Sequence, residues 1–223
     1  MKLEAYRNKS RIILAIDFIG DNLSKRLDEI IEKIAAVKIG LPMLLSKKGS
    51  LVLNMLAESG AYIIADLKLA DIPKIMVETC KRVAEKTNGI IAHAFIGSQA
   101  LRELQEYLNE IGIELFLVTA MTHPGAEEFI NRHFEEFLVV AKDLADGIVA
   151  PATFRKYIVE ARKKLKTKLI LSPGVGAQGA SLGLALESGA DFEIIGRAIT
   201  LSEDPVEEIE KINSIHKKII EKT

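Results

Sequence analysis

Three side chains that could carry out proton chemistry lie within six residues of this chain. Asp66, Lys68 and Asp71 belong to the segment Asp-Leu-Lys-Leu-Ala-Asp-Ile-Pro, which directly follows the apolar run 61–65. Alternate residues of a strand share a face, so Asp66 and Lys68 are predicted to project together. An amine beside carboxylates where a buried strand ends is typical of an active site. A structural interpretation stays open, in which Asp71 caps the next helix and Asp66 and Lys68 form a solvated pair.

Two glycine-containing segments could bind a phosphate. Residues 172–179 read Ser-Pro-Gly-Val-Gly-Ala-Gln-Gly, and Gly196-Arg197 follows a strand candidate at 191–195. Glycine lets backbone N–H groups approach a ligand closely, and a guanidinium can hold two phosphate oxygens at once. One such loop is often only a tight turn. Two loops, one of them with an arginine, together predict a phosphate site.

Eight short apolar runs could supply the strands that position these residues. They are residues 11–17, 36–39, 61–67, 89–93, 113–119, 147–149, 168–172 and 191–195, and helical patterns lie between them. Most runs are nearly continuously apolar, which indicates parallel strands covered on both faces. Eight strand–helix units predict an α/β fold, the (β/α)8 TIM barrel, with a doubly wound open sheet as the alternative.

The last helical pattern is the clearest. Residues 203–222 place isoleucines and Val206 at helical spacing, and Asp204-Pro205 supplies a cap and a first-turn proline. The glycines at 60 and 189 are predicted to end helices before strands.

Composition limits the classes of protein and partner. The 223 residues are 48% hydrophobic but only 5% aromatic, which predicts one domain, 1–223, with an aliphatic core. The net charge of −1 gives no general attraction to nucleic acid or to acidic membranes. Cys80 is the only cysteine and lies in a helical pattern, so we expect a buried, inert thiol and a reducing, cytoplasmic location. Neither a signal peptide nor a membrane span is predicted.

In a barrel, the loops after the strands gather at one rim, where chemistry takes place. Polar and charged residues follow strand after strand: Asp17, Lys38, Asp66, Lys68, His93, Thr122, His123, Gln178 and Arg197. Their convergence on one rim favours an active site over a set of solvated pairs.

These motifs together resemble the orotidine 5′-phosphate decarboxylase family, most closely its short archaeal form, over nearly the whole chain. The resemblance rests on Leu14-Ala15-Ile16-Asp17, Val37-Lys38-Ile39-Gly40, Asp66-x-Lys68-x-x-Asp71-Ile72-Pro73, Met121-Thr122-His123-Pro124-Gly125, Ser172-Pro173-Gly174-Val175-Gly176-Ala177-Gln178 and Gly196-Arg197. It implies a (β/α)8 barrel that dimerises through its C-terminal rim. It also implies conversion of orotidine 5′-phosphate to UMP, the last step of de novo pyrimidine nucleotide synthesis, without a metal or an organic cofactor.

The resemblance further implies roles at the reacting carbon. Lys68 would protonate C6 of the pyrimidine as CO2 leaves. Asp66 would lie beside the substrate carboxylate, and Lys38 would link to Asp66 while touching the ribose. Asp71, with Ile72, would reach into the site of the partner subunit.

The same resemblance implies the contacts to the rest of the substrate. Asp17 would hold a ribose hydroxyl, and Thr122 would hydrogen-bond the base. The remaining substrate-binding residues would be Pro173, Gly174, Val175, Gly176, Gln178, Gly196 and Arg197, with Gln178 and Arg197 on the phosphate.

Two positions depart from the family pattern. Ile75 stands where a hydroxyl residue is common, which removes a possible ribose contact, and Thr122 stands where serine is usual. The four histidines have no metal-ligand spacing. His93 and His123 are expected to make local hydrogen bonds, and His133 and His216 to lie on helix surfaces.

Two other functions stay open. Sugar-phosphate aldolases and decarboxylases of the same suprafamily share the Asp-x-Lys-x-x-Asp motif, but they hold Mg2+ partly through a Glu at the position of Lys38, whose charge would repel the metal. A non-catalytic nucleotide-binding barrel would leave the cost of clustering three charged groups unexplained.

Overall fold

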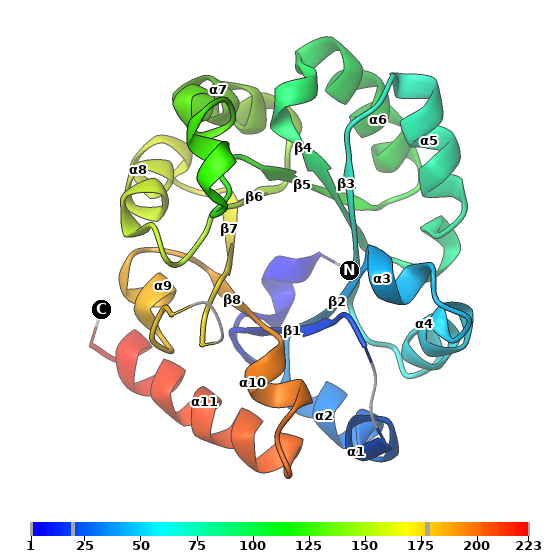
Figure 1. The fold of residues 1–223 in the computed structure, drawn as a ribbon, viewed down its shortest axis with the longest axis vertical. Helices are drawn as coiled ribbons and strands as arrows, with labels where there is room; N and C mark the ends of the chain where they lie inside the picture. Colours follow the sequence, from blue (N-terminus) through cyan, green and yellow to red (C-terminus); the bar gives the residue numbers. More distant parts are fainter. Residues whose placement is uncertain (1, 19–20, 177–178, 223) are drawn as a thin grey trace.

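The chain forms a closed barrel of eight parallel strands in sequence order, and helices surround it in the computed structural model (Figure 1). The structure describes residues 2–18, 21–176 and 179–222. The strands are β1 Ile12–Ile16, β2 Ala36–Gly40, β3 Ile63–Leu69, β4 Gly89–His93, β5 Glu114–Val118, β6 Gly147–Val149, β7 Leu169–Pro173 and β8 Phe192–Ile195. The predicted (β/α)8 TIM barrel is therefore confirmed, and the open sheet is excluded by the pairing of β8 with β1.

The helices connect successive strands on the outside. They are α1 Asp21–Lys25, α2 Leu27–Lys33, α3 Leu41–Leu44, α4 Gly49–Glu58, α5 Pro73–Lys81, α6 Ser98–Glu110, α7 Phe134–Leu144, α8 Arg155–Leu165, α9 Leu184–Glu187, α10 Arg197–Thr200 and α11 Pro205–Ile220. Short 3-10 helices are η1 Leu3–Tyr6, η2 Ala84–Lys86, η3 Ala94–Ile96, η4 Pro124–Glu127 and η5 Asn131–His133. In the described part of the chain, no helix is both long and apolar enough to cross a membrane.

Local signals place several helix ends as expected. The Asp204 carboxylate accepts hydrogen bonds from the N–H groups of Val206 and Glu207, each at 3.0 Å, and so caps α11. Gly60 and Gly189 follow α4 and α9 with φ of 73° and 103°, a backbone conformation that glycine adopts without steric cost.

Two layers of apolar side chains hold the barrel together. One fills the interior and includes Ile13, Ile64 and Phe116; the other lies between the strands and the helices. Inward and outward residues alternate along each strand, so the continuous apolar runs of the sequence serve both layers. Cys80 is fully buried in the outer layer, as predicted.

The N-terminal end of the barrel is closed by η1. Leu3 is fully buried in the interior layer, and its backbone N–H donates to the Glu114 carboxylate at 2.6 Å. The same carboxylate accepts a hydrogen bond from the Tyr62 hydroxyl at 2.5 Å. The ring of Tyr6 packs edge-on against that of Tyr62. Figure 1 shows this short N-terminal helix within the outline of the barrel.

Candidate active site

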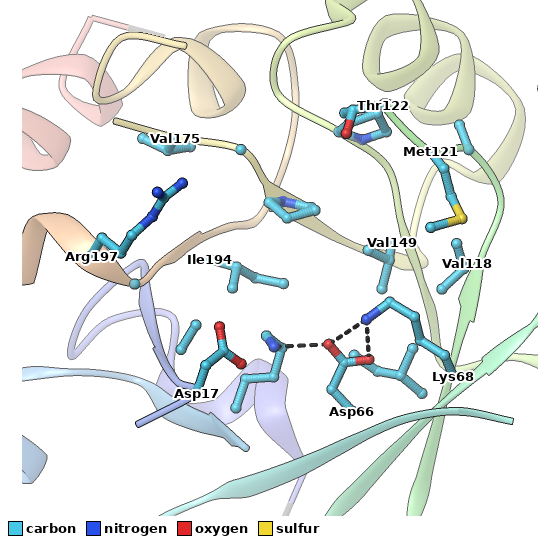
Figure 2. A pocket seen from close by; sticks show the side chains of 18 residues that line it. Asp17, Asp66, Lys68, Val118, Met121, Thr122, Val149, Val175, Ile194 and Arg197 are labelled. Atoms are coloured by element: carbon cyan, nitrogen blue, oxygen red, sulfur yellow. Dashed lines mark hydrogen bonds and ion pairs between the residues drawn. The ribbon is translucent and has the colours of Figure 1, made fainter. Parts of the chain in front are cut away.

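A cavity of about 570 Å3 opens at the carboxyl ends of the strands (Figure 2). Ten of the predicted site residues line it: Asp17, Lys38, Asp66, Lys68, Thr122, Pro173, Gly174, Val175, Gly196 and Arg197. Most of the residues predicted to converge on one rim therefore do so, because parallel strands all end there. His93 and His123, which were part of that prediction, do not line the cavity. Three cationic and two anionic side chains in this lining give it a net positive charge.

Asp66 lies between two lysines. Its carboxylate accepts hydrogen bonds from Lys38 Nζ at 2.8 Å and from Lys68 Nζ at 2.8 Å to both oxygens. The Asp66 and Lys38 side chains are only 7% and 10% exposed, whereas the Lys68 side chain is 43% exposed. Lys38 and Asp66 thus form a buried pair, and Lys68 presents its ammonium to the cavity.

The backbone of β3 is irregular where it carries these residues. Its pairing with β4 shifts register between Ala65 and Leu69, and Lys68 has a φ of 45°. A left-handed conformation is uncommon for any residue other than glycine. Asp66 and Lys68 do meet, as predicted, but on a distorted strand rather than on a regular one.

The two lysines control the ionisation of Asp66. Burial by itself would raise the pKa of this carboxyl, but the charges of Lys38 and Lys68 and their hydrogen bonds outweigh burial and lower the pKa below its ordinary value. Asp66 is therefore a carboxylate at neutral pH, and the three groups form a charge network with one net positive charge.

Asp17 follows β1 at the same rim and is exposed. The glycine at position 40, where β2 ends, leaves the room that its carboxylate occupies. A Cβ built on Gly40 would collide with Asp17 Oδ1. The Val-Lys-Ile-Gly motif thus contributes a charged side chain at Lys38 and open space at Gly40.

The predicted phosphate loops lie on the opposite side of the cavity from Lys68. Figure 2 shows Arg197 and Val175 facing Lys68 and Thr122 across the pocket. Arg197 is the first residue of α10 and is exposed. Gly176, by contrast, does not line the cavity, and its N–H donates to the Ala180 carbonyl at 2.8 Å. Gln178 was also predicted to bind substrate but lies outside the described residues.

Asp71 and Ile72 lie outside the cavity of their own chain. The Asp71 carboxylate accepts a hydrogen bond from the N–H of Ile72 at 2.7 Å, and the Ile72 residue is 62% exposed. Ile72 precedes α5 as its N-cap residue and makes no side-chain capping bond. The interpretation of Asp71 as the cap of this helix was therefore wrong, and within one subunit Asp71 is not part of the charge network.

His93 ends β4 and is buried beside this network. Burial first, and the charge of Lys68 second, lower its pKa to about 4, while Asp66 opposes the shift. Its ring packs against Phe95 with 4.8 Å between centroids, and Nδ1 has no hydrogen-bond partner among the described residues. His93 is therefore a neutral imidazole at pH 7. The local hydrogen bonding expected of this residue is not made by Nδ1.

The prediction that His216 lies on a helix surface was wrong. It is 2% exposed, and Nε2 lies 2.8 Å from Glu193 Oε2. Glu193, on β8, also accepts hydrogen bonds from the N–H groups of Gly183, the N-cap residue of α9, and of Ala185 in its first turn. This buried cluster ties α11 to the chain that follows the predicted phosphate loop. His133, in contrast, is exposed as predicted.

Sequence reasoning missed the apolar part of the lining. Ile91, Val118, Val149, Ile194 and Met121 line the cavity together with the charged residues. A signal was available for Ile91, which lies two positions before the rim residue of its strand and therefore points to the same interior. This apolar surface can exclude water from a flat ring placed next to Lys68.

Comparisons with known proteins show which family the chain is similar to. A family model described as "Orotidine 5′-phosphate decarboxylase / HUMPS family" matches residues 10–212. The chain is 37% identical over 208 residues to an orotidine 5′-phosphate decarboxylase of Methanococcoides burtonii, covering 92% of this chain and 96% of that protein. It is 42% identical over 178 residues to the enzyme of Aeropyrum pernix, covering 77% of this chain and 72% of that protein.

Solved structures are similar over almost the whole barrel. The orotidine 5′-monophosphate decarboxylase of Sulfolobus solfataricus superimposes with a TM-score of 0.87 at 35% identity, covering 95% of this chain and 100% of that one. The Methanocaldococcus jannaschii enzyme, solved in complex with the inhibitor BMP, gives a TM-score of 0.84 at 30% identity, with coverages of 93% and 98%.

Proposed function

The chain belongs to the orotidine 5′-phosphate decarboxylase / HUMPS family, and from this we propose that it converts orotidine 5′-phosphate to UMP. With this activity the protein is a carboxy-lyase of pyrimidine nucleotide synthesis. The observation that carries the proposal is the Lys38–Asp66–Lys68 network, which lies across the cavity from Arg197. A substrate with an anionic group at each end fits these two cationic regions.

Lys68 is the proton donor of this reaction. When the bond between C6 and the carboxylate carbon breaks, CO2 leaves and the electron pair stays on C6, in the plane of the ring. An ammonium at that carbon stabilises the developing charge, and transfer of its proton to C6 then yields UMP. The support is that the Lys68 side chain is 43% exposed and that both Asp66 oxygens hold its Nζ at 2.8 Å. The amine regains its proton from solvent.

Asp66 repels the substrate carboxylate, and Lys38 holds the charges of Asp66 and Lys68 in place. A substrate carboxylate placed ~4 Å from Asp66 would be repelled by roughly 4 kcal/mol at an effective dielectric constant near 20. This repulsion is relieved as CO2 departs, yet it is small beside the ~20 kcal/mol that very slow uncatalysed reactions require. Most of the barrier reduction must therefore come from electrostatic stabilisation by the preorganised charges, which Lys38 holds in place from its buried position.

The other end of the cavity binds the phosphate and the sugar. Arg197, Gly196 and the loop Pro173-Gly174-Val175 take the phosphate, and Gln178 joins them on the strength of the family motif. Gly176 supports the turn of this loop, because its N–H is used by Ala180. Asp17 accepts from a ribose hydroxyl, and Thr122 hydrogen-bonds the base. Phosphate binding far from C6 can be used to align the reacting ring.

We also propose a homodimer with shared sites. Large apolar side chains are exposed in the segments that follow the first four strands, among them Phe18, Leu45, Ile72, Ile75 and Phe95. Exposed apolar residues gathered on one rim are typical of an interaction surface. Asp71 and Ile72 lie on this rim outside their own cavity, so they would complete the cavity of a partner.

Subunit exchange tests the shared site. Lys68→Ala and Asp71→Ala proteins, each inactive alone, are mixed equally and allowed to exchange. A two-fold heterodimer then has one site with both lesions and one intact site, so about a quarter of all sites should regain activity. If Asp71 acts within its own chain, every site keeps a lesion. Verified exchange with no recovered activity would therefore rule out the shared site.

The decarboxylation itself is tested by measuring UMP formed from orotidine 5′-phosphate in the presence of a chelator. We propose a reaction without metal or organic cofactor, so chelation should have no effect. A sugar-phosphate aldolase of the same suprafamily would need Mg2+ and would form no UMP. In this chain Lys38 Nζ lies 2.8 Å from the Asp66 carboxylate, where its charge opposes a metal ion. A binding protein without activity would bind UMP but release no CO2.

Two broader proposals accompany this function. Residues 1–223 form one domain, which the closed pairing of β1 to β8 supports. The protein acts in the cytoplasm, because its single cysteine is a buried thiol that suits a reducing compartment.

A further inference from the structure

The loop after β5 forms one wall of the cavity. Ala120, Met121 and Thr122 all line it, and none of the three belongs to a helix or a strand. The start of the loop is held by Thr119, whose N–H and hydroxyl both donate to the Val149 carbonyl. A loop residue that contacts substrate needs further support, because its backbone has no regular hydrogen-bond ladder.

Asn131 supplies that support from η5. Its Oδ1 accepts the hydrogen bond of the Met121 N–H at 3.0 Å, and its Nδ2 donates to the Met121 carbonyl at 3.0 Å. One side-chain amide thus binds both backbone groups of one residue, as a neighbouring strand would. The peptide units on both sides of Met121 are fixed, including the one that leads directly into Thr122.

The orientation of the Asn131 amide is itself fixed. Nδ2 also donates to Glu127 Oε1 at 2.7 Å, and the Asn131 residue is 6% exposed. The oxygen must face the Met121 N–H and the nitrogen must face the two acceptors, so only one orientation satisfies all three bonds. A buried amide with every group paired is a rigid support, whereas losing one partner leaves a buried group unpaired.

We propose that Asn131 is a positioning residue for recognition of the base, acting through Thr122. The inference rests on the proposed function, in which Thr122 hydrogen-bonds the pyrimidine. Thr122 is exposed to the cavity, so the direction of its hydroxyl depends on the backbone that Asn131 holds. Asn131 itself does not line the cavity and touches no substrate.

Ligands with and without a base test this role. Dissociation constants of UMP and of ribose 5-phosphate are measured for the wild type and for Asn131→Ala and Asn131→Asp. Asn131→Asp is nearly isosteric and keeps the acceptor, but it turns a carboxylate oxygen toward the Met121 carbonyl and Glu127. Both variants should bind UMP about tenfold more weakly, which corresponds to ~1.4 kcal/mol. Their affinity for ribose 5-phosphate should stay within about twofold of the wild type.

Two further variants make the test specific. Glu127→Gln keeps an acceptor oxygen for Asn131 and should leave UMP binding unchanged. If Asn131 acts through Thr122, the double variant Asn131→Ala/Thr122→Ala should bind UMP no more weakly than Thr122→Ala alone.

Each other outcome overturns the inference. Unchanged UMP binding in both Asn131 variants shows that the hydrogen bonds from Asn131 to Met121 do not position the base contact. Equal losses for UMP and ribose 5-phosphate show a general structural role, and additive losses in the double variant show that Asn131 acts apart from Thr122. Failure of the proposed function is separate, because the wild type itself would then form no UMP from orotidine 5′-phosphate, whatever the Asn131 variants bind.

Discussion

Replacing Asp66 with Asn should destabilise the protein because it leaves Lys38 buried without a counterion. At an effective dielectric constant near 20, two charges separated by the Lys38–Asp66 distance of 2.8 Å attract by about 6 kcal/mol, part of which offsets the desolvation of both groups. Removing one partner of such a buried pair costs about 3–5 kcal/mol. The contact with Lys68 adds little, since that side chain is 43% exposed and can turn to water. We expect the free energy of unfolding to fall by about 3 kcal/mol.

Urea unfolding followed by far-ultraviolet circular dichroism measures this change, since the chain has no tryptophan. Asp17→Asn is the matched control: it makes the same change in the same cavity, but at an exposed carboxylate that pairs with no lysine or arginine among the described residues. It should cost less than about 0.5 kcal/mol. The wild-type advantage over Asp66→Asn should be full at neutral pH. It should disappear as the pH falls through the lowered pKa of Asp66, where the carboxylate becomes protonated. Equal stability of the two variants at pH 7 would refute the reasoning.

Three further changes have expected outcomes. His93 has a folded-state pKa of about 4, below its ordinary value near 6.5, so between these pH values the unfolded chain binds a proton at His93 that the folded protein does not. The free energy of unfolding of the wild type should therefore fall by up to about 3 kcal/mol from pH 7 to pH 4. Parallel urea titrations of His93→Gln should lack this loss. Arg197→Ala should raise KM for orotidine 5′-phosphate strongly but barely affect turnover of the phosphate-free nucleoside orotidine; an equal loss with both substrates would contradict a phosphate role. Gly40→Ala should displace the flexible Asp17 carboxylate, lowering kcat/KM with little change in thermal stability, and unchanged kinetics would show that Asp17 does not contact substrate.

The fold could be predicted because its signals are local and repeated. Most strands are largely apolar, since each faces the interior on one side and the helices on the other. Once the barrel is known, the meeting of Asp17, Lys38, Asp66 and Arg197 follows from parallel strands that end at one rim.

The parts of the site that could not be predicted depend on tertiary structure. No pattern in the sequence shows that Lys68 adopts a positive φ, because that conformation arises from the irregular pairing of β3 with β4. The hydrogen bonds between Asn131 and Met121 join η5 to the loop after β5, and such a contact leaves no periodic signal in the sequence. His216 did have a signal, since it follows Ile212 by four residues and so lies on the buried face of α11.

The left-handed backbone conformation of Lys68 lowers the stability of the folded protein at a position where the proposed function needs an amine. Glycine adopts this conformation freely, whereas another residue pays about 1 kcal/mol for it. Mutational drift that is screened for folding alone should therefore tend to remove Lys68, and Lys68→Gly should be more stable than Lys68→Ala although both lack the amine. On the proposed function, the chemistry of the amine would oppose that drift, so the strained backbone would be kept for the sake of the lysine.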